Sequence, residues 1–254
     1  MFKQDLIFRK PLMNAAGTLG FSPDLRVQIP WDDLGAFVTN PLSLRPRKPT
    51  DQPASIEYPG GFLLHTGLPN PGLLAAINKY ARRWADSPLP VIVNLMADRP
   101  EETKLMVESL EGRENVTAVE LGFAPLLADD IILLAIEMCL GELPLIVSLA
   151  AEQVLSLGPR ALQTGAAAIS LAASRGMLPL THNPDPESGV RLITGRLFGP
   201  AQFPRSLEVV HSAAKLGLPI YGSGGVYSKE NAEVMLTAGA IGVQMDAGLW
   251  LPKV

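Results

Sequence analysis

The stretch Pro219-Ile-Tyr-Gly-Ser-Gly-Gly-Val226 decides the fold, because it places several local signals side by side. The apolar run 218–221 predicts a buried strand, which the glycines then end. Ser228 is positioned to cap a helix that stops at Gly239, and the run 241–245 predicts a second strand. Strand, glycine turn, helix and strand together make one parallel β/α unit.

The glycines of this stretch, Gly222, Gly224 and Gly225, permit two interpretations. Glycines at the carboxyl end of a strand let backbone N–H groups approach an anion, beside the positive end of a helix. The same residues are typical of a tight turn that binds nothing. The stretch alone does not decide between an anion site and a plain turn.

Further strands of the same kind recur along the chain and mostly alternate with helical patterns. Sustained alternation implies a parallel sheet, because each crossover needs a connection the size of a helix. Eight such units in 254 residues predict an α/β fold, a closed (β/α)8 TIM barrel, as a single domain over 1–254 with any site at the carboxyl ends of its strands. The predicted strands are 11–17, 36–40, 91–95, 118–121, 145–149, 168–171, 218–221 and 241–245.

Three other segments lie outside this alternation. A short strand is expected at 6–8, before the first unit. The proline-rich segment 41–71 is predicted to be a long connection, and connections of that length are usually functional or disordered. The segment 177–199 is predicted to be a loop in which 183–189 turns between two extended arms.

The end of the chain is too short for a full eighth helix, because only 247–254 follow the last strand. Part of the outer wall is then bare unless another chain or the N-terminus covers it. We therefore expect a homo-oligomer or a partner subunit, with Trp250 and Leu251 in the contact.

Composition narrows the class of protein. The chain is 47% hydrophobic and 18% charged, with a net charge of -4, so neither nucleic acid nor an anionic membrane is expected as a partner. A single cysteine, Cys139, excludes an internal disulfide and is expected in the core. Three histidines and no cysteine pair predict no metal site. No membrane span or signal peptide is evident, and we expect a cytoplasmic protein.

Short motifs spread from about residue 6 to 249 resemble the dihydroorotate dehydrogenase family, in particular its soluble class 1 enzymes. Enzymes of that family oxidise dihydroorotate with a bound FMN, while a basic side chain removes a proton from the substrate. The motifs that carry the resemblance are Pro11-Leu-Met-Asn-Ala-Ala-Gly-Thr-Leu-Gly20, Leu34-Gly-Ala-Phe-Val-Thr39, Tyr58-Pro-Gly-Gly61, Gly67-Leu-Pro-Asn-Pro-Gly72, Val91-Ile-Val-Asn94, Gly199-Pro-Ala201, Ile220-Tyr-Gly-Ser-Gly-Gly-Val226 and Ala238-Gly-Ala-Ile-Gly-Val-Gln244.

The resemblance implies a set of binding residues. The flavin ring would lie on the backbone of Ala15, Ala16 and Gly17, with Asn94 on the flavin side, and Asn70 would bind the substrate pyrimidine. The phosphate would lie on Gly222, Gly224 and Gly225. Plain structural roles compete with these: Asn70 precedes Pro71 and a helix and so suits an N-cap, and Asn94 needs some partner at the end of a buried strand.

The chain departs from the family where the chemistry takes place. Ala124 stands at the position of the family's cysteine base, and Leu126 replaces a substrate asparagine. Asn40 and Ser148 occupy positions at which the family has lysines. After the eighth strand, where the family has Gly-Thr for the phosphate, this chain has Asp246-Ala247. Phe198 replaces a serine near the pocket mouth.

These departures favour a barrel that has lost the FMN-dependent reaction and serves as a non-catalytic, accessory or binding protein. One alternative is an active FMN-dependent oxidoreductase with an altered substrate, which uses His65 or Ser148 in place of the lost base. Another is an authentic dihydroorotate dehydrogenase. General-base catalysis contributes about 10²–10⁴-fold, and a methyl group such as that of Ala124 cannot supply it.

Overall fold

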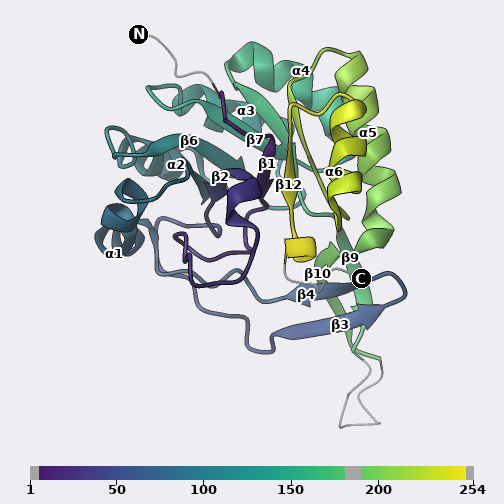
Figure 1. The fold of residues 1–254 in the computed structure, drawn as a ribbon. Coiled ribbons are helices and arrows are strands. Elements are labelled where there is room, and N and C mark those ends of the chain that lie inside the picture. Colours follow the sequence, from purple (N-terminus) through teal and green to yellow (C-terminus); the bar gives the residue numbers. More distant parts are fainter. Residues whose placement is uncertain (1–5, 181–189, 250–254) are drawn as a thin grey trace.

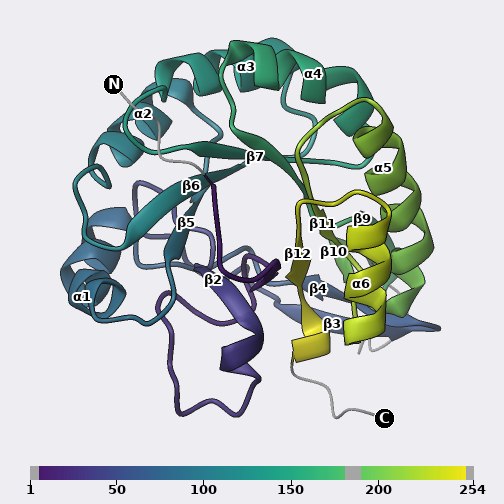
Figure 2. The same cartoon turned by 45° about the horizontal axis from the view of Figure 1, so that its top comes forward.

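In a computed structural model that describes residues 6–180 and 190–249, eight parallel strands close into a barrel, which confirms the predicted fold (Figure 1 and Figure 2). Their order around the wall is β1-β12-β11-β8-β7-β6-β5-β2. The strands are β1 (Leu12–Asn14), β2 (Leu34–Val38), β5 (Val91–Met96), β6 (Val116–Gly122), β7 (Leu145–Leu149), β8 (Ala168–Leu171), β11 (Ile220–Ser223) and β12 (Gly242–Met245).

The strands are mostly apolar because both of their faces are buried. Side chains that point inward, such as Ile92, Ile146 and Tyr221, form one cluster inside the barrel. Side chains from the alternate positions, such as Val93 and Val147, join a larger cluster under the helices.

Helices ring the outside of the barrel (Figure 2). Their first turns follow the sequence signals: Pro100 begins α2, and the Ser228 hydroxyl accepts the N–H of Asn231 at 3.2 Å and caps α6. The helices of the described residues are α1 (Leu73–Ala85), α2 (Pro100–Glu108), α3 (Asp129–Met138), α4 (Val154–Thr164), α5 (Phe203–Lys215) and α6 (Lys229–Thr237). None of them is long and apolar enough to cross a membrane.

A four-stranded antiparallel sheet lies at the carboxyl end of the barrel, and its strand order is β3-β4-β10-β9. The expectation of a long connection over 41–71 is therefore wrong in part, since β3 (Ala54–Tyr58) and β4 (Gly61–His65) form a hairpin there. The extended arms predicted within 177–199 are β9 (Arg175–Pro179) and β10 (Leu192–Phe198), and 181–189 lie outside the described residues. The hairpin carries little periodic signal in the sequence, because prolines and glycines flank each short strand.

The short strand expected at 6–8 is also wrong, because this segment has no strand partner. Leu6 and Phe8 instead pack against the inner cluster, and Ile7 is exposed. The side chains of Leu6 and Phe8 therefore cover the inner cluster and do not extend a sheet.

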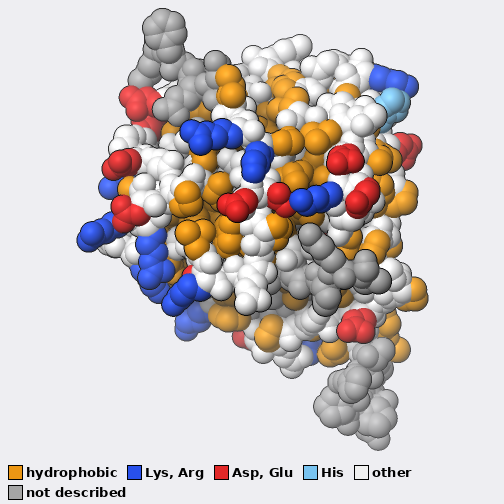
Figure 3. Space-filling model, viewed as in Figure 1, with side chains coloured by type: hydrophobic (Ala, Val, Ile, Leu, Met, Phe, Trp, Pro, Cys, Tyr) orange, Lys and Arg blue, Asp and Glu red, His pale blue; other side chains and the backbone are white. Residues whose placement is uncertain are grey.

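The wall beside β12 is covered from within the chain. The outward side chains Val243 and Met245 are 0% and 7% exposed, and Ile29 and Trp31 pack against the same outer cluster. Asp33, at the end of the short helix η1 (Trp31–Asp33), forms a 2.8 Å ion pair with Lys229 of α6. On this face hydrophobic side chains lie in separate patches among charged ones (Figure 3).

Beyond β12 the described chain ends with the short helix η4 (Ala247–Leu249), so no full eighth helix is present among the described residues. Leu249 is buried in the outer cluster. Trp250 and Leu251, the expected contact residues, lie outside the described residues.

Candidate active site at the barrel mouth

The glycine turn after β11 is fixed by packing against the start of α5. Gly224 and Gly225 have φ values of 94° and 74°, which favour glycine. A Cβ atom on Gly225 would lie 2.3 Å from the backbone nitrogen of Phe203, and one on Gly224 would lie 2.6 Å from the Ser206 hydroxyl. The turn therefore requires these glycines whether or not an anion binds.

A buried carboxylate shares this turn. Asp246 follows β12, is 3% exposed, and its Oδ1 has no hydrogen-bond partner. Burial raises the pKa of Asp246 to about 6, although the backbone N–H groups of Ala247, Gly225 and Gly248 lie near enough to favour the ionised form. The Asp246 carboxylate thus lies beside the N–H of Gly225, one of the residues that the resemblance assigns to a phosphate.

The mouth also carries an arginine, beside the turn after β1. Nη1 of Arg196 on β10 lies 3.0 Å from the point where a Cβ atom on Gly17 would stand, and the guanidinium lies 5.4 Å from the ring centre of Phe198. The pKa of Arg196 is lowered to about 10, first by burial and then by the positive charge of Arg175. The backbone at Gly17, expected to face a flavin, faces this guanidinium.

The turn after β1 that contains Ala15, Ala16 and Gly17 is held from both sides. The Ala15 N–H donates to the carbonyl of Met245 at 2.7 Å, and the Ala15 carbonyl accepts the Thr18 hydroxyl at 2.6 Å. These bonds join the turn to β12, so Gly17 and Asp246 belong to neighbouring parts of one rim.

Asn40 and Ser148, which stand where the family has lysines, have structural surroundings of different kinds. Oδ1 of Asn40 accepts the N–H of Gly20 at 3.1 Å, and the Asn40 N–H donates to the Gly20 carbonyl at 2.7 Å. Asn40 therefore closes the β1 turn onto the end of β2. Ser148 is half-buried near the end of β7, paired with Gly122 and Ser170 on the flanking strands.

Asn94 has its partner inside the barrel. Its Nδ2 donates to Oε2 of Glu120 at 2.8 Å, while the Glu120 Oε1 accepts Ser170 Oγ at 2.6 Å and Gln244 Nε2 at 2.7 Å. Glu120 is 1% exposed, so four strands meet on a carboxylate sealed from solvent. The sequence indicated only that Asn94 needs a partner; the strand Ala118-Val-Glu-Leu121 holds the signal, since a glutamate in a buried run requires donors.

Asn70 joins two loops. Its Oδ1 accepts the N–H of Gly72 at 3.0 Å and both the N–H and the hydroxyl of Ser43, at 3.2 and 3.1 Å. The N-cap of α1 is Gly72, so the N-cap interpretation of Asn70 is wrong. The side chain is 7% exposed, and its Nδ2 donates to the Leu68 carbonyl.

The position of the family's base lies in a short loop after β6. The Ala124 N–H donates to Oδ1 of Asp98 at 2.7 Å, which ties this loop to the end of β5. Leu126, two residues on, is exposed and has a φ of 66°. The Ala124 side chain is a methyl group, and the titratable side chain in contact with this position is the Asp98 carboxylate, which accepts the Ala124 N–H.

His65, the alternative base, lies at the end of β4. Its Nδ1 is 2.8 Å from the Thr194 carbonyl and its Nε2 is 3.2 Å from the Thr50 hydroxyl. Both ring nitrogens are therefore engaged with the antiparallel sheet and its flanking loop.

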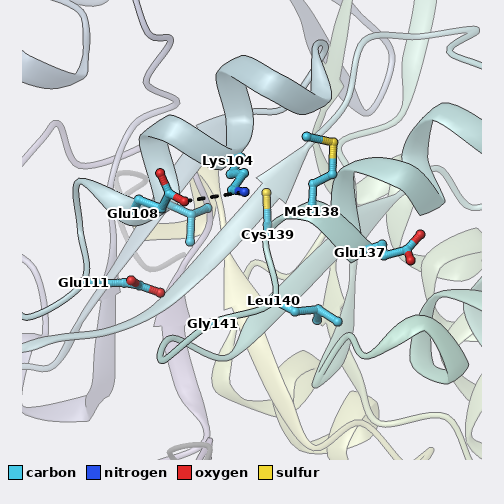
Figure 4. A pocket seen from close by; sticks show the side chains of 9 residues that line it. Lys104, Glu108, Glu111, Glu137, Met138, Cys139, Leu140 and Gly141 are labelled. Carbon is cyan, nitrogen blue, oxygen red and sulfur yellow. Dashed lines mark ion pairs between the residues drawn. The ribbon is translucent and has the colours of Figure 1, made fainter.

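Cys139 lies far from the mouth, in a hollow of about 410 Å³ between α2 and α3 (Figure 4). The thiol is 3% exposed, and burial raises its pKa to about 12, so it is protonated at neutral pH. Lys104 and Glu108 form an ion pair at the rim of this hollow. Among the described residues no cluster of His, Cys, Asp and Glu is suited to hold a metal ion.

Comparisons with known proteins agree with the motifs. A family model described as dihydroorotate dehydrogenase matches residues 3–124. The catalytic subunit of dihydroorotate dehydrogenase B (NAD(+)) from Pelobacter propionicus is 31% identical, over 97% of this chain and 86% of that protein. The same subunit from Pyrococcus furiosus is 29% identical, over 97% of this chain and 85% of its own.

Among solved structures, a crystal structure of DHODH in complex with ferulenol from Eimeria tenella superposes with a TM-score of 0.73. The match covers 96% of this chain and 78% of that one, at 17% identity. At that identity the likeness concerns the fold.

Proposed function

The chain belongs to the dihydroorotate dehydrogenase family, and we propose that this member has lost the FMN-dependent oxidation of dihydroorotate and acts as a binding or accessory protein. The observation that carries this proposal is the buried carboxylate of Asp246 beside the Gly225 N–H. A carboxylate about 4 Å from a phosphate would cost on the order of 4 kcal/mol per unit charge at an effective dielectric of about 20.

The ring side of the site supports the same proposal. The Arg196 guanidinium lies directly over Gly17, so a flavin ring and this side chain would compete for one place. No lysine stands at Asn40 or Ser148 to stabilise the negative charge of a reduced ring. The residues present therefore do not fit FMN, at either its phosphate or its ring.

The substrate side lacks the family's base, and the carboxylate in contact with that position, Asp98, is bonded to the Ala124 N–H. Ala124 stands where the base belongs, and His65 has both ring nitrogens in contact with other groups. Asn70, the candidate for the substrate pyrimidine, uses its oxygen for three bonds within the protein. The family's base and lysines are thus absent from this chain, and the amide of Asn70 has a structural role.

The test is a measurement of flavin content. Protein refolded or expressed with excess FMN and then desalted should show no flavin absorption, and dihydroorotate should reduce no electron acceptor in its presence. A double variant, Asp246→Gly with Ala247→Thr, restores the family's Gly-Thr and should gain affinity for FMN. A wild-type protein that retains stoichiometric FMN would contradict the proposal.

An active FMN-dependent oxidoreductase with an altered substrate is the second candidate, because the relatives named above are catalytic subunits. Retained FMN without turnover of dihydroorotate would favour this candidate. Retained FMN with turnover would make the chain a dihydroorotate dehydrogenase in the strict sense.

We also propose that the chain is one cytoplasmic domain over 1–254 that assembles as a homo-oligomer or with a partner subunit. The relatives are themselves named as subunits, which supports assembly. Size-exclusion chromatography with light scattering tests it: a monomer at all concentrations, with no co-purifying protein, would contradict this part of the proposal.

A further inference from the structure

Arg196 is the one arginine among the described residues that is not classed as exposed, and its N–H groups have no acceptor there. Arg160, for comparison, is exposed and pairs with both Asp129 and Asp130. Arg196 is half-buried, yet within the part of the chain that the structure describes its side chain has no hydrogen bond or ion pair. A guanidinium carries five donors in a rigid fork, and leaving them buried and unpaired is costly.

The neighbouring strand increases this cost. Arg175 on β9 stands directly opposite Arg196 on β10 in the antiparallel register. Like charges at directly opposite positions destabilise a strand pair. Arg175 likewise has no ion pair or side-chain hydrogen bond among the described residues. The contact of Arg196 with the ring of Phe198 offsets the cost only in part.

The place where the two arginines stand makes this arrangement informative. They lie on the rim of the barrel, where Arg196 faces the β1 turn at Gly17 and Arg175 is exposed to solvent. A positively charged pair at the carboxyl end of a (β/α)8 barrel lies where this fold places its sites. Two cations without internal partners call for an anion from solution.

We propose that Arg196 and Arg175 bind the oxyanion group, a carboxylate or a phosphate, of a small ligand at the barrel mouth. The guanidinium fork of Arg196 matches the two oxygens of such a group, and Arg175 adds a second charge from the solvent side. The inference rests on the proposed function, since it requires that the Gly17 side of the mouth is not occupied by a flavin.

Thermal unfolding in solutions of constant ionic strength tests the pair, with inorganic phosphate and succinate as probes and chloride as the reference. One or both probes should raise the unfolding temperature of the wild type relative to chloride, and which of them does so identifies the source of the oxyanion. Arg196→Met should weaken the response at least about tenfold in apparent affinity. Arg196→Lys should retain part of it. Arg205→Met, which removes an exposed arginine of α5, should respond as the wild type does.

The same variants supply a check that does not depend on finding the right probe. In chloride alone, Arg196→Met should unfold at the same temperature as the wild type or higher, because it removes an unpaired, partly buried charge. A clear fall in unfolding temperature would show that Arg196 has an internal partner and would overturn the inference. An equal response of wild type and Arg196→Met to both probes would overturn it as well.

The two proposals fail separately. Retained FMN contradicts the proposed function and is read from the absorption spectrum. A colourless protein that does not respond to phosphate or succinate contradicts only the oxyanion site.

Discussion

At the centre of the barrel Glu120 accepts three hydrogen bonds from neutral donors, whereas at the mouth Asp246 is equally buried and keeps an oxygen without a partner. Glu120 lies within β6 and Asp246 follows β12, four strands away around the barrel, yet only Glu120 has hydrogen-bond partners for both carboxylate oxygens. The difference shows that the polar groups around Glu120 inside the barrel are hydrogen-bonded to one another, whereas the rim holds a carboxylate oxygen of Asp246 without a partner. Buried polar groups without partners are rare in folded proteins and tend to mark functional places.

The largest expected effect on stability comes from removing the Glu120 carboxylate, whose hydrogen bonds are all formed. Glu120→Ala leaves Asn94, Ser170 and Gln244 as buried donors without an acceptor. Each such group costs about 1–3 kcal/mol, so we expect a loss of more than about 3 kcal/mol in the free energy of unfolding. Urea denaturation measures it, with the exposed Glu233→Ala as the control. A loss equal to that of the control would mean that the network is not a structural core.

The buried carboxylate of Asp246, which has an oxygen without a partner, predicts that the stability of the fold depends on pH. The pKa of Asp246 in the folded protein, about 6, lies above its ordinary value of 3.8, so the folded state binds the proton more tightly. The stabilising contribution is fully present below about pH 4 and is lost as the pH rises through about 6. The change corresponds to about 3 kcal/mol of unfolding free energy.

Asp246→Asn tests this assignment. The variant removes the titrating group, so its stability should vary less than that of the wild type between pH 4 and pH 7, and it should exceed the wild type at pH 7. Denaturation curves at several pH values measure both. Parallel pH profiles for the two proteins would show that Asp246 is ionised at low cost, which would also weaken the argument against a bound phosphate.

The sequence predicts the barrel of this protein better than the antiparallel sheet at its mouth. The barrel strands were predictable because side chains on both faces are apolar, and the run from 218 to 245 identified one β/α unit complete with its Ser228 cap. The β3–β4 hairpin was not, because short strands between prolines carry little periodic signal. Local patterns predict local structure, and this sheet depends on pairing between β4 and β10, which lie far apart in the sequence.

The candidate site divides in the same way. Resemblance identified which positions had changed, including Ala124 and Asp246, but not where their neighbours point. Arg196 could not be placed beside Gly17 from sequence, since that contact joins segments separated by most of the chain. The partner of Asn94 likewise required the fold, because Glu120 reaches it only across adjacent strands of a closed barrel.

The smallest expected effect concerns Asn70, which lies between the core and the rim. Asn70→Ala leaves the N–H groups of Gly72 and Ser43 without their acceptor, while the Ser43 hydroxyl keeps the Arg45 carbonyl at 2.8 Å, and we expect a loss of about 1–3 kcal/mol. Asn70→Asp keeps an acceptor and should lose less, and Ser43→Ala, which removes one of the three donors, should couple with Asn70→Ala in a double-mutant cycle. Unfolding free energies measure all of these. If Asn70→Ala were as stable as the wild type, the side chain would not be needed to hold the loops, and a ligand would become the better reason for an asparagine at this position.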